Sequence, residues 1–571
     1  MNVLISFCLI LLSFTGLSQT IPSHRLSNWS NVGSGYISHT NAREINVDSL
    51  QLANPSQDLG QIINEVIHSS QSPLKIVFGK GTYNITSEII LRSNVSLIGI
   101  GNATKLNFNT STTNCIVISG TKQNATYALE TDLIKGSSSI KLVKQLPMKE
   151  RELFLLQSND SSLVSSDWAI GSTGQLLTVK SNQNSTIIFE EEFNRHHSVA
   201  NQPRVIKVNP INNVQISNVS ITRLKEVPSQ GNAIKLQYAT NCKIECVSFY
   251  NSDFAHIGLN YSANNTIEGC FFKDAFNYGG GGNGYGVVVQ FASSSNLILN
   301  NVFTDLRHSI LLQAGANGNA IAYNYSIKPY WTGTWLPANS AGDLVLHGNY
   351  VYSNLFEGNC VQNIVIDGSH GINGKHNLFF KNRAEDYGIF MDISTPTDSQ
   401  LFVGNEITNK DGNALYILSG NGHFEYGNKV KGETLPANTD NISITSFLSK
   451  ELASNHTTAF GNSRKTETNY FNNSEQRHAL GNKTKCEAVA VSNNIDIGTK
   501  LMSYPNPCSD YFTIEGLSAT AKIQILNAEG RLIFETINKD HIYISQLSKG
   551  MYIVIARDNN LIYSTRLAVS H

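Results

Sequence analysis

The 571-residue sequence predicts an all-β protein whose main body is a parallel β-helix. Short apolar runs such as Val287–Val289 and Ile364–Ile366 recur between turn-forming residues. Only 15% of the residues are charged, and Asn, Ser and Gly occupy many polar positions. Long helices usually carry many Glu, Lys, Arg and Ala residues, whereas short β-branched runs bounded by turns are typical of strands.

A repeat supports the solenoid. From about residue 212 onward, one strand pattern returns every 20 to 35 residues. Its copies begin at Val214, Cys242, Asn265, Asn296 and Asn319. A fixed motif at such a period indicates stacked coils, each burying its apolar face against its neighbours. The strands are too close together for intervening helices, which favours a parallel β-helix.

The charge balance and the N-terminal end restrict the function classes. The chain has 42 basic and 43 acidic residues, a net charge of -1, and lacks the basic excess that a nucleic-acid binder needs. An apolar run followed by small residues predicts a signal peptide over residues 1–18. No later run is long enough to span a membrane. The seven remaining cysteines do not predict a disulfide framework, and Cys242, Cys246 and Cys270 are expected to be small buried side chains.

The C-terminal segment forms a separate β pattern, with Tyr504-Pro505-Asn506-Pro507, Ile523–Asn527 and Gly550–Val554. It closely resembles the type A C-terminal sorting domain of the type IX secretion system of Bacteroidota. The resemblance implies export through the periplasm to the cell surface or the medium, with the type IX secretion machinery as partner. We expect the sorting domain, a small β-sandwich, at 501–571, preceded at 431–500 by the end of the main domain and a polar linker.

The start of the body has its own signature: an amphipathic segment at Leu59–Ser69, then Ile76–Tyr83, then Val95–Gly101. This resembles the entry of the pectate-lyase-like right-handed β-helix superfamily, in which a capping helix precedes the first coils. The resemblance implies a right-handed parallel β-helix that forms the catalytic domain over 19–430, with a β-rich insertion at 124–209. It is specific for fold and weak for reaction, because lyases, hydrolases, epimerases and non-enzymatic proteins share this fold.

Alternation along a second strand series separates its inward and outward faces. The first and third residues of each strand are aliphatic and should point inward. The fourth residues should form an outward polar ladder, which consists of Gln237, Asn260, Gln290, Gln313, His347, Asp367 and Asp392. Titratable groups concentrate at its last three positions, within about 10 Å if the coils are about 4.8 Å apart.

Neighbouring turns and loops complete the candidate site. Beside the ladder lie two candidate cations, Arg307 and Arg383, and one candidate base, His308. The substrate-binding candidates are Gln290, Gln313, Asn349, His370, Tyr285, Tyr387, Trp331 and Trp335. The two tryptophans stand in a polar loop, where flat rings stack on sugar faces.

These residues predict a secreted polysaccharide lyase that cleaves an acidic, uronate-containing polysaccharide by β-elimination. The reaction removes a proton next to a carboxylate, so it needs a base and a cation or strong donor at that carboxylate. His347 or His308 fits the base, with Tyr387 as a third candidate, and Arg307 or Arg383 fits the cation. Calcium held by Asp367 and Asp392 is an alternative neutralising group.

Three alternatives remain open at this stage. The first is a glycoside hydrolase with Asp367 and Asp392 as its carboxylate pair. The second is a uronate epimerase, which begins with the same proton abstraction. The third is a non-catalytic glycan-binding protein. We expect a monomer.

Overall fold

The computed structural model describes residues 21–33, 35–38, 41–144, 146–183, 186–227, 230–439, 442–449, 486, 503–514, 517–526, 532–538, 541–558 and 561–570. The predicted signal peptide and most of the predicted linker lie outside the described residues. The chain divides into two compact units, Met1–Lys485 and Cys486–His571.

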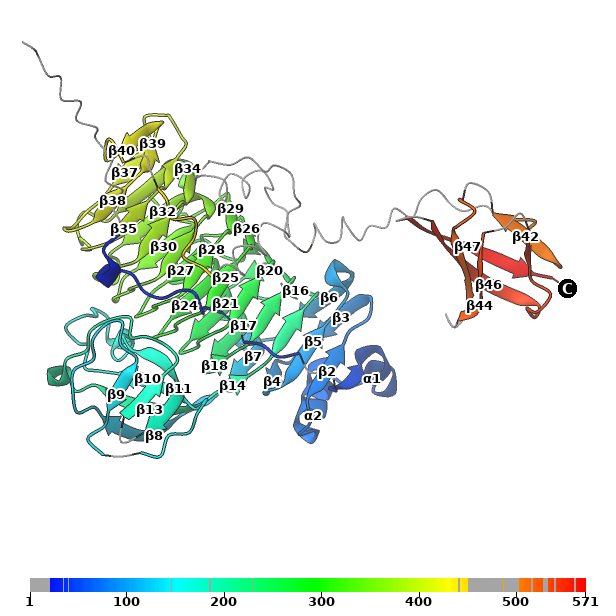
Figure 1. The fold of residues 1–571 in the computed structure, drawn as a ribbon, viewed down its shortest axis with the longest axis horizontal. Helices are drawn as coiled ribbons and strands as arrows, with labels where there is room; N and C mark the ends of the chain where they lie inside the picture. The colour runs from blue at the N-terminus through cyan, green and yellow to red at the C-terminus, as the bar shows by residue number, and fades with distance from the viewer. Residues whose placement is uncertain are drawn as a thin grey trace, which may run out of the picture. The chain divides into compact units, whose positions relative to one another are not determined.

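The first unit is a parallel β-helix, as the sequence predicts (Figure 1). One face is a 12-stranded sheet. In sheet order its strands are β1 (Arg43–Asn46), β2 (Leu74–Val77), β5 (Val95–Ile98), β15 (Gln215–Ser217), β19 (Lys243–Glu245), β22 (Thr266–Glu268), β25 (Leu297–Leu299), β28 (Ala320–Ala322), β31 (Leu355–Glu357), β33 (Leu378–Phe380), β35 (Leu401–Val403) and β38 (Phe424–Tyr426).

The remaining strands of the coils form two further series. One contains β3 (Gly81–Ile85), β6 (Thr104–Phe108), β16 (Ser220–Arg223), β20 (Ser248–Ser252), β23 (Phe271–Ala275), β26 (Val302–Thr304), β29 (Tyr325–Ile327), β36 (Glu406–Ile407), β39 (Asn428–Val430) and β40 (Glu433–Leu435). The other contains β4 (Ile89–Leu91), β7 (Asn114–Ser119), β17 (Asn232–Gln237), β21 (Ala255–Asn260), β24 (Tyr285–Gln290), β27 (His308–Leu312), β30 (Leu344–His347) and β37 (Leu415–Ile417). The long strands β32 (Cys360–Asp367) and β34 (Arg383–Met391) contribute to both series. A short pair, β14 (Ile211–Asn212) with β18 (Ala239–Thr240), lies at a turn.

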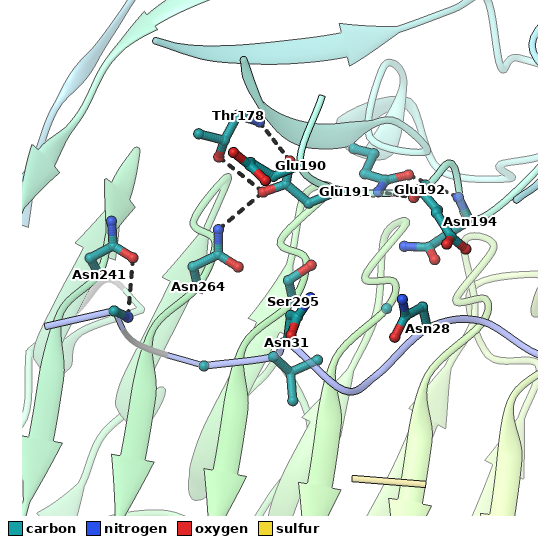
Figure 2. Close-up of a pocket in the computed structure, with 15 residues that line it drawn as sticks. Asn28, Asn31, Thr178, Glu190, Glu191, Glu192, Asn194, Asn241, Asn264 and Ser295 are labelled. Carbon is teal, nitrogen blue, oxygen red and sulfur yellow. Dashed lines mark hydrogen bonds between the residues drawn. The ribbon is translucent and has the colours of Figure 1, made fainter. Parts of the chain in front are cut away.

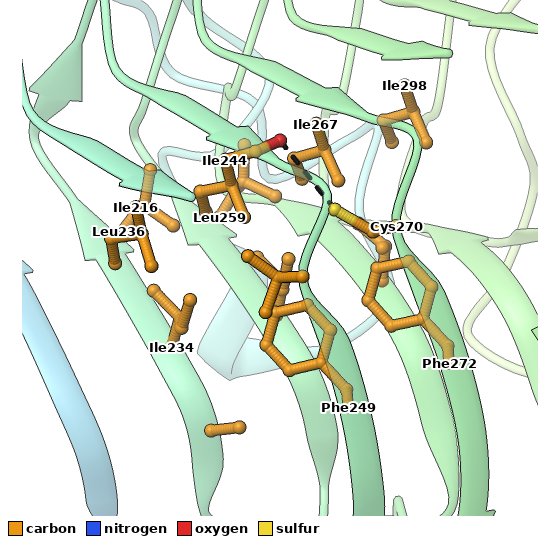
Figure 3. Packing of buried hydrophobic residues seen from close by; sticks show 14 of the residues in the cluster. Ile216, Ile234, Leu236, Ile244, Phe249, Leu259, Ile267, Cys270, Phe272 and Ile298 are labelled. Carbon is orange, nitrogen blue, oxygen red and sulfur yellow. Dashed lines mark hydrogen bonds between the residues drawn. The ribbon is translucent and has the colours of Figure 1, made fainter. Parts of the chain in front are cut away.

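Aliphatic and aromatic rows fill the interior (Figure 3). Ile216, Ile244, Ile267 and Ile298 occupy one register position on consecutive coils. The rings of Phe249 and Phe272 stack with centroids 4.9 Å apart. Each coil therefore buries its apolar side chains against identical positions of the next, which is what stabilises a solenoid.

Buried asparagine ladders explain the high asparagine content. Each side-chain amide donates to the side-chain oxygen of the next coil at 2.8–3.0 Å. One ladder runs through Asn265, Asn296, Asn319, Asn354 and Asn377, and the other through Asn301, Asn324, Asn359, Asn382, Asn405 and Asn428. The ladders satisfy polar groups that would otherwise be costly to bury.

Two helices, α1 (Val47–Ala53) and α2 (Leu59–Ser69), precede the first complete coils. The predicted helix at Leu59–Ser69 is confirmed. Asp58 caps α2 by accepting from the Gln61 N–H at 3.1 Å. Leu59, Ile63 and Ile67 are buried against the solenoid core, so the helix closes its N-terminal end.

Residues 21–33 and 35–38 belong to a strap that crosses many coils. At the last coils, Arg25 of the strap donates to the Gly422 carbonyl at 2.7 Å. At the first coils, the Tyr36 hydroxyl lies 3.0 Å from Gln215 Oε1. Trp29 is 1% exposed and donates to the Ser353 carbonyl at 3.1 Å. The strap therefore joins coils that are far apart along the solenoid.

We expect Trp29→Ala to lower the free energy of unfolding by about 3–5 kcal/mol, because it removes a large buried ring and leaves a cavity. Chemical denaturation of the full chain measures the loss. Asn28→Ala changes an exposed neighbour in the same strap and is the control. Equal losses from the two substitutions would contradict the anchoring role of Trp29.

His256 is a buried imidazole on β21, beside the stacked rings of Phe249 and Phe272, and neither ring nitrogen has a hydrogen-bond partner within normal geometry. Burial lowers the pKa of His256 to about 3, although the nearby backbone of Lys273 and Asp274 acts in the opposite direction. The ordinary histidine pKa is 6.5, so the unfolded chain binds a proton that the folded chain does not bind between these pH values. His256 therefore destabilises the fold progressively as the pH falls below 6.5.

The variant His256→Leu is expected to be more stable than the parent protein, with the difference growing by about 1.4 kcal/mol per pH unit as the pH falls below 6.5. Denaturation midpoints across this range measure the difference. The control is His196→Leu, at a half-exposed imidazole beside Asp132. A stability difference independent of pH would contradict a neutral buried His256.

An antiparallel domain interrupts the coils between β7 and β14. Its six-stranded arrangement follows the order β8 (Thr121–Ala128), β13 (Arg204–Asn209), β10 (Leu153–Gln157), β11 (Gln175–Gln183), β12 (Thr186–Phe189) and β9 (Ser139–Lys141). It has its own core around Phe154, Leu177 and Phe189. One face also packs on turn residues of the β-helix, including Tyr238 and Ala292.

The second unit contains two antiparallel sheets. One consists of β41 (Ser503–Tyr504), β42 (Tyr511–Ile514) and β45 (Ile542–Tyr543), and the other of β43 (Lys522–Leu526), β44 (Leu532–Ile537), β46 (Gly550–Asp558) and β47 (Leu561–Val569). Phe512, Ile523 and Val554 belong to the core of this unit. No helix in the described part of the chain is both long and apolar enough to cross a membrane.

The cysteine prediction is partly wrong. Cys242 and Cys270 are free and buried, as expected. Cys246, however, is disulfide-bonded. Cys246 stands at a left-handed turn position with a φ of 55°, which takes it out of the inward-facing rows that contain the other two residues.

Candidate active site

A cleft of about 1210 Å³ lies along the face formed by the strand series from β7 to β37. Its lining includes eleven of the fourteen predicted site residues, which are Tyr285, Gln290, Arg307, His308, Gln313, Trp331, Trp335, His347, Asp367, His370 and Asp392. Charged side chains in the lining are few: Lys235 and Arg307 are basic, and Asp367 and Asp392 are acidic.

The predicted outward ladder is present in the expected register. Gln237 pairs with Asn260, Asn260 with Gln290, and His347 with Asp367. Gln313 Nε2 donates to Gln290 Oε1 at 2.6 Å, and Gln290 Nε2 donates to Asn260 Oδ1 at 3.0 Å. The amides thus fix one another and form a rigid polar floor at one side of the titratable groups.

His347 and Asp367 form a hydrogen-bonded pair on adjacent coils. His347 Nδ1 lies 2.6 Å from Asp367 Oδ2, and the side chains are 12% and 20% exposed. Burial on its own raises the pKa of Asp367, but the neighbouring His347 and the Ser369 N–H, at 3.0 Å from Oδ1, lower it overall. The ionised carboxylate therefore holds the imidazole proton on Nδ1 and leaves Nε2 as the acceptor.

His308 lies beside this pair, with its ring centroid 6.3 Å from that of His347. Its Nδ1 lies 2.7 Å from the Gly342 carbonyl, which only accepts hydrogen bonds, so this nitrogen carries the proton. Burial and the charge of Arg307 lower the pKa of His308 to about 3. His308 is consequently neutral near pH 7 and presents Nε2 as an acceptor.

Arg307 is a buried cation, 6% exposed, between two aromatic rings. Its guanidinium carbon lies 4.6 Å from the Trp331 ring centroid and 5.5 Å from that of Tyr285. Nη1 donates to the Gly279 carbonyl at 2.7 Å, whereas Nε has no hydrogen-bond partner. Among the described residues, no carboxylate forms an ion pair with Arg307. A buried charge without a partner is costly, which indicates a site for an anionic group.

Aromatic side chains from two insertions form the walls. Trp331 and Trp335 come from the loop before β30, and Trp335 is 71% exposed. Trp168, from the short helix η3 (Asp167–Ala169) of the antiparallel domain, also lines the cleft, and its ring centroid is 5.4 Å from that of His370. Sequence reasoning did not identify Trp168, because nothing in the period of the coils shows where the inserted domain returns to the solenoid.

Three predicted site residues lie outside the cleft lining. Arg383 forms ion pairs with Glu385 at 2.7 Å and Glu406 at 3.1 Å. Asn349 is fully buried, and its Oδ1 accepts from the backbone N–H of Ser165 at 3.0 Å and of Ser166 at 3.2 Å. Asn349 therefore supports the inserted domain.

Tyr387 is the third of these residues. It packs with Leu336 and Phe390 beneath the tryptophan loop and is 8% exposed. Its hydroxyl donates to the Pro337 carbonyl at 3.3 Å. This placement makes Tyr387 a support of the loop.

The oxygens of Asp367 and Asp392 do not fit the predicted calcium site. Asp367 accepts from His347 and Ser369, and Asp392 Oδ1 accepts from the Ser394 N–H and hydroxyl at 2.8 and 2.7 Å. Calcium takes six to eight oxygen ligands. No group of three or more His, Cys, Asp or Glu side chains in the described chain has an arrangement that holds a metal ion.

A second cavity, of about 350 Å³, lies where the strap meets the inserted domain (Figure 2). Glu191 is half-buried there, and this partial burial raises its pKa. Thr178 Oγ1 at 2.9 Å and Asn264 Nδ2 at 3.2 Å both donate to its Oε1. These contacts connect the inserted domain to a turn of the β-helix and give the residue a structural role.

Models of three protein families match the chain. They are described as right handed beta helix region, over residues 204–354, as rhamnogalacturonase A/epimerase, pectate lyase-like, over residues 45–179, and as secretion system C-terminal sorting domain, over residues 502–570. The fold and the cleft thus define a right-handed β-helix protein of the pectate-lyase-like type. The chain combines that body with a type IX sorting domain, which directs it to the cell surface or the extracellular space.

Solved structures also resemble the chain. The tailspike gp61 of Pseudomonas phage phi297 is 12% identical, with a TM-score of 0.48 over 68% of this chain and 74% of that one. The tailspike gp49 of Pseudomonas phage LKA1 is 14% identical, with a TM-score of 0.42 over 71% and 79%. The gp54 tailspike of Acinetobacter baumannii bacteriophage AP22 is 11% identical, with a TM-score of 0.38 over 70% and 78%. No curated protein matches the sequence.

Proposed function

We propose that the protein is a secreted polysaccharide lyase that cleaves an acidic polysaccharide at a uronate by β-elimination. The observation that carries this proposal is Arg307, a buried cation in the cleft wall without an acidic partner in the described chain, directly before His308 and near the His347–Asp367 pair. A uronate carboxylate is the group that such a site would bind, and its neutralisation is the first requirement of the reaction.

The proposed reaction gives each residue one task. Arg307 binds the carboxylate, and His347 Nε2 removes the proton from the adjacent carbon, C5. The electron pair of that C–H bond forms the C4=C5 double bond, and the glycosidic bond at C4 breaks. Burial raises the pKa of Tyr285, so its phenol stays protonated and is our candidate donor to the leaving oxygen.

His347 suits the base role better than His308. A base works best when its pKa lies near the operating pH, and the pKa of about 3 makes His308 a weak proton acceptor. His347 has an ionised partner, Asp367, to stabilise the positive charge that it acquires. We assign His308, Gln290 and Gln313 to orienting sugar hydroxyls.

A glycoside hydrolase remains the second candidate, because Asp367 and Asp392 lie on adjacent coils and both line the cleft. That mechanism needs one carboxyl group to stay protonated as an acid. The pKa of Asp367 is lowered, and both of its oxygens already accept hydrogen bonds. These facts favour the lyase.

Incubation with polyuronates and mixed acidic polysaccharides, followed by ultraviolet absorbance of the unsaturated uronate, tests the proposal. A lyase raises this absorbance and the number of reducing ends together. New reducing ends without the absorbance would identify a hydrolase. Changed uronate configuration without chain cleavage would identify an epimerase, and binding without any product would identify a glycan-binding protein.

A further inference from the structure

A cluster of basic side chains lies where the strap, the inserted domain and a turn of the solenoid meet. It contains Arg25 from the strap, Lys135 from the inserted domain, and Lys375 and His376 from the turn before β33. Lys135 Nζ donates to the Arg25 carbonyl at 3.1 Å and lies 3.2 Å from His376 Nδ1. Three segments that are far apart in the sequence therefore meet at one half-buried ammonium group.

The positive charges of this cluster are not balanced by ion pairs. Arg25, Lys135 and Lys375 form no ion pair with any described residue. Burial lowers the pKa of Lys135 to about 8. Burial also lowers the pKa of His376 to about 3, and four neighbouring basic groups act in the same direction: Lys135, Arg25, His24 and Lys375. Like charges gathered in a partly buried place are unfavourable, and a bound anion would relieve this cost.

The cluster also has N–H groups without acceptors in the described chain. An ammonium only donates, so His376 Nδ1 accepts from Lys135 and the imidazole proton is on Nε2. No described residue accepts from this Nε2, and Lys135 has a third N–H group besides the two already used. Arg25 Nη1 donates to the Gly422 carbonyl at 2.7 Å, whereas its other N–H groups have no described acceptor. Positive charge together with free donors is what an oxyanion requires.

The position of His376 in the repeat is a second, independent observation. His376 has a left-handed backbone, with a φ of 67°, two residues before a strand of the 12-stranded sheet. The same position on other coils is also left-handed, and there it holds only asparagine, serine or glycine: Asn213, Asn241, Asn264, Ser295, Gly318, Ser353, Ser399 and Gly422. Glycine adopts this conformation at no steric cost, and asparagine is enriched in it. The turn itself therefore does not explain an imidazole at this one coil, beside Lys135.

We propose that Arg25, Lys135 and His376 form a binding site for a sulfate or phosphate group, either as the free ion or as a monoester on a glycan. Guanidinium, ammonium and imidazole N–H groups are suitable donors to such oxygens. The exposed side chains of Lys375 and His24 would add positive charge at the rim. None of these residues lines the cleft, so the site is separate from the proposed reaction. A bound anion would join the strap, the inserted domain and the solenoid.

Calorimetric titration of the full chain tests this site without any substrate of the reaction. The probes are sodium sulfate, sodium phosphate, a hexose sulfate and a hexose phosphate, with sodium chloride added to hold the ionic strength constant. We expect saturable binding of sulfate or phosphate. Equally tight binding of an ester would assign the bound group to a glycan, and binding of the free ions alone would assign it to an inorganic anion. No saturable binding of any probe would overturn the proposal.

Substitutions identify the residues that bind the anion. Lys135→Met and Arg25→Gln should each raise the Kd of the anion about 10-fold or more, because each removes a positive charge and its donors. His376→Asn should have a smaller effect and should keep the fold, since asparagine is common at this turn position. Lys141→Met removes an exposed lysine of the same inserted domain and is the control.

Melting temperatures in sulfate and in chloride show whether each variant is folded and binds. Sulfate stabilises folded proteins in general, so only a larger increase for the parent protein than for Lys135→Met supports the site. The proposal fails if Lys135→Met, Arg25→Gln and His376→Asn all bind the anion as the parent does. It also fails if Lys141→Met weakens binding as much as Lys135→Met, because the attraction would then depend on the overall charge.

Discussion

Replacement of His347 by alanine is expected to lower kcat/KM for uronate elimination by about 10²- to 10⁴-fold, the usual contribution of a positioned general base. The loss should fall mainly on kcat, because in the proposed reaction Nε2 accepts the transferring proton. The measurement is the initial rate of unsaturated product formation, with the melting temperature recorded alongside. Added imidazole should restore part of the activity, since the substitution leaves space for a small base.

Three companion variants separate this role from a structural one. Asp367→Asn should lower kcat about 10²-fold or more. Unlike the carboxylate, an amide neither fixes the proton on His347 Nδ1 nor stabilises the positive charge that the imidazole acquires. His308→Gln should cost less than His347→Ala, since His308 is assigned to orientation. His196→Ala, at an exposed imidazole of the inserted domain, should have no effect. If His308→Gln is the more damaging change and imidazole rescues only that variant, the two histidines have exchanged roles.

Much of the cleft could be predicted because, in a solenoid, residues one repeat apart in the sequence lie at equivalent positions on adjacent coils. Once the aliphatic first and third residues were placed inward, the fourth residues had to form one outward row, and His347 and Asp367 indeed pair across adjacent coils. Strand alternation and coil spacing are local properties, so a single sequence contains them. The same logic applies to the rows Ile216, Ile244 and Ile267 in the core.

The residues that the sequence misplaced depend on contacts that the period does not encode. Arg383 precedes Asp392 by less than one coil, yet it lies at the other end of the long strand β34, where Glu406 of the next coil pairs with it. Asn349 follows His347 closely, but a turn redirects it to the backbone of Ser165 in the inserted domain. Trp168 reaches the cleft from that same domain. Each case requires the path of an insertion or a turn, which strand alternation does not determine.

Arg307→Gln is expected to lower kcat about 10²- to 10³-fold on an acidic polysaccharide and to raise KM as well. The guanidinium would bind the substrate carboxylate and, more strongly, the negative charge that develops there as the proton leaves. Arg307→Lys should recover part of the activity, because it keeps the charge and loses the planar geometry. Initial rates of unsaturated product formation give both constants.

Arg383→Gln provides the matched control. It removes an arginine that also lies on this solenoid but is already paired with Glu385 and Glu406 outside the cleft lining. We expect it to affect stability more than catalysis, since it removes a cation that two partly buried carboxylates contact. Comparable catalytic losses in the Arg307 and Arg383 variants would remove the argument that Arg307 neutralises the substrate.

A methyl-esterified substrate sharpens the distinction, because the ester already neutralises the carboxylate. If Arg307 acts on that charge, the ratio of parent to Arg307→Gln activity should be much smaller on the ester than on the free acid. If Arg307 only supports Trp331 and Tyr285, whose rings lie on its two sides, the variant should lose activity equally on both substrates. The four rates form a cycle in which the coupling between side chain and carboxylate is measured directly. Arg307 is buried and has no acidic partner in the described chain. The comparison of acid and ester therefore tests the charge of Arg307 separately from its packing.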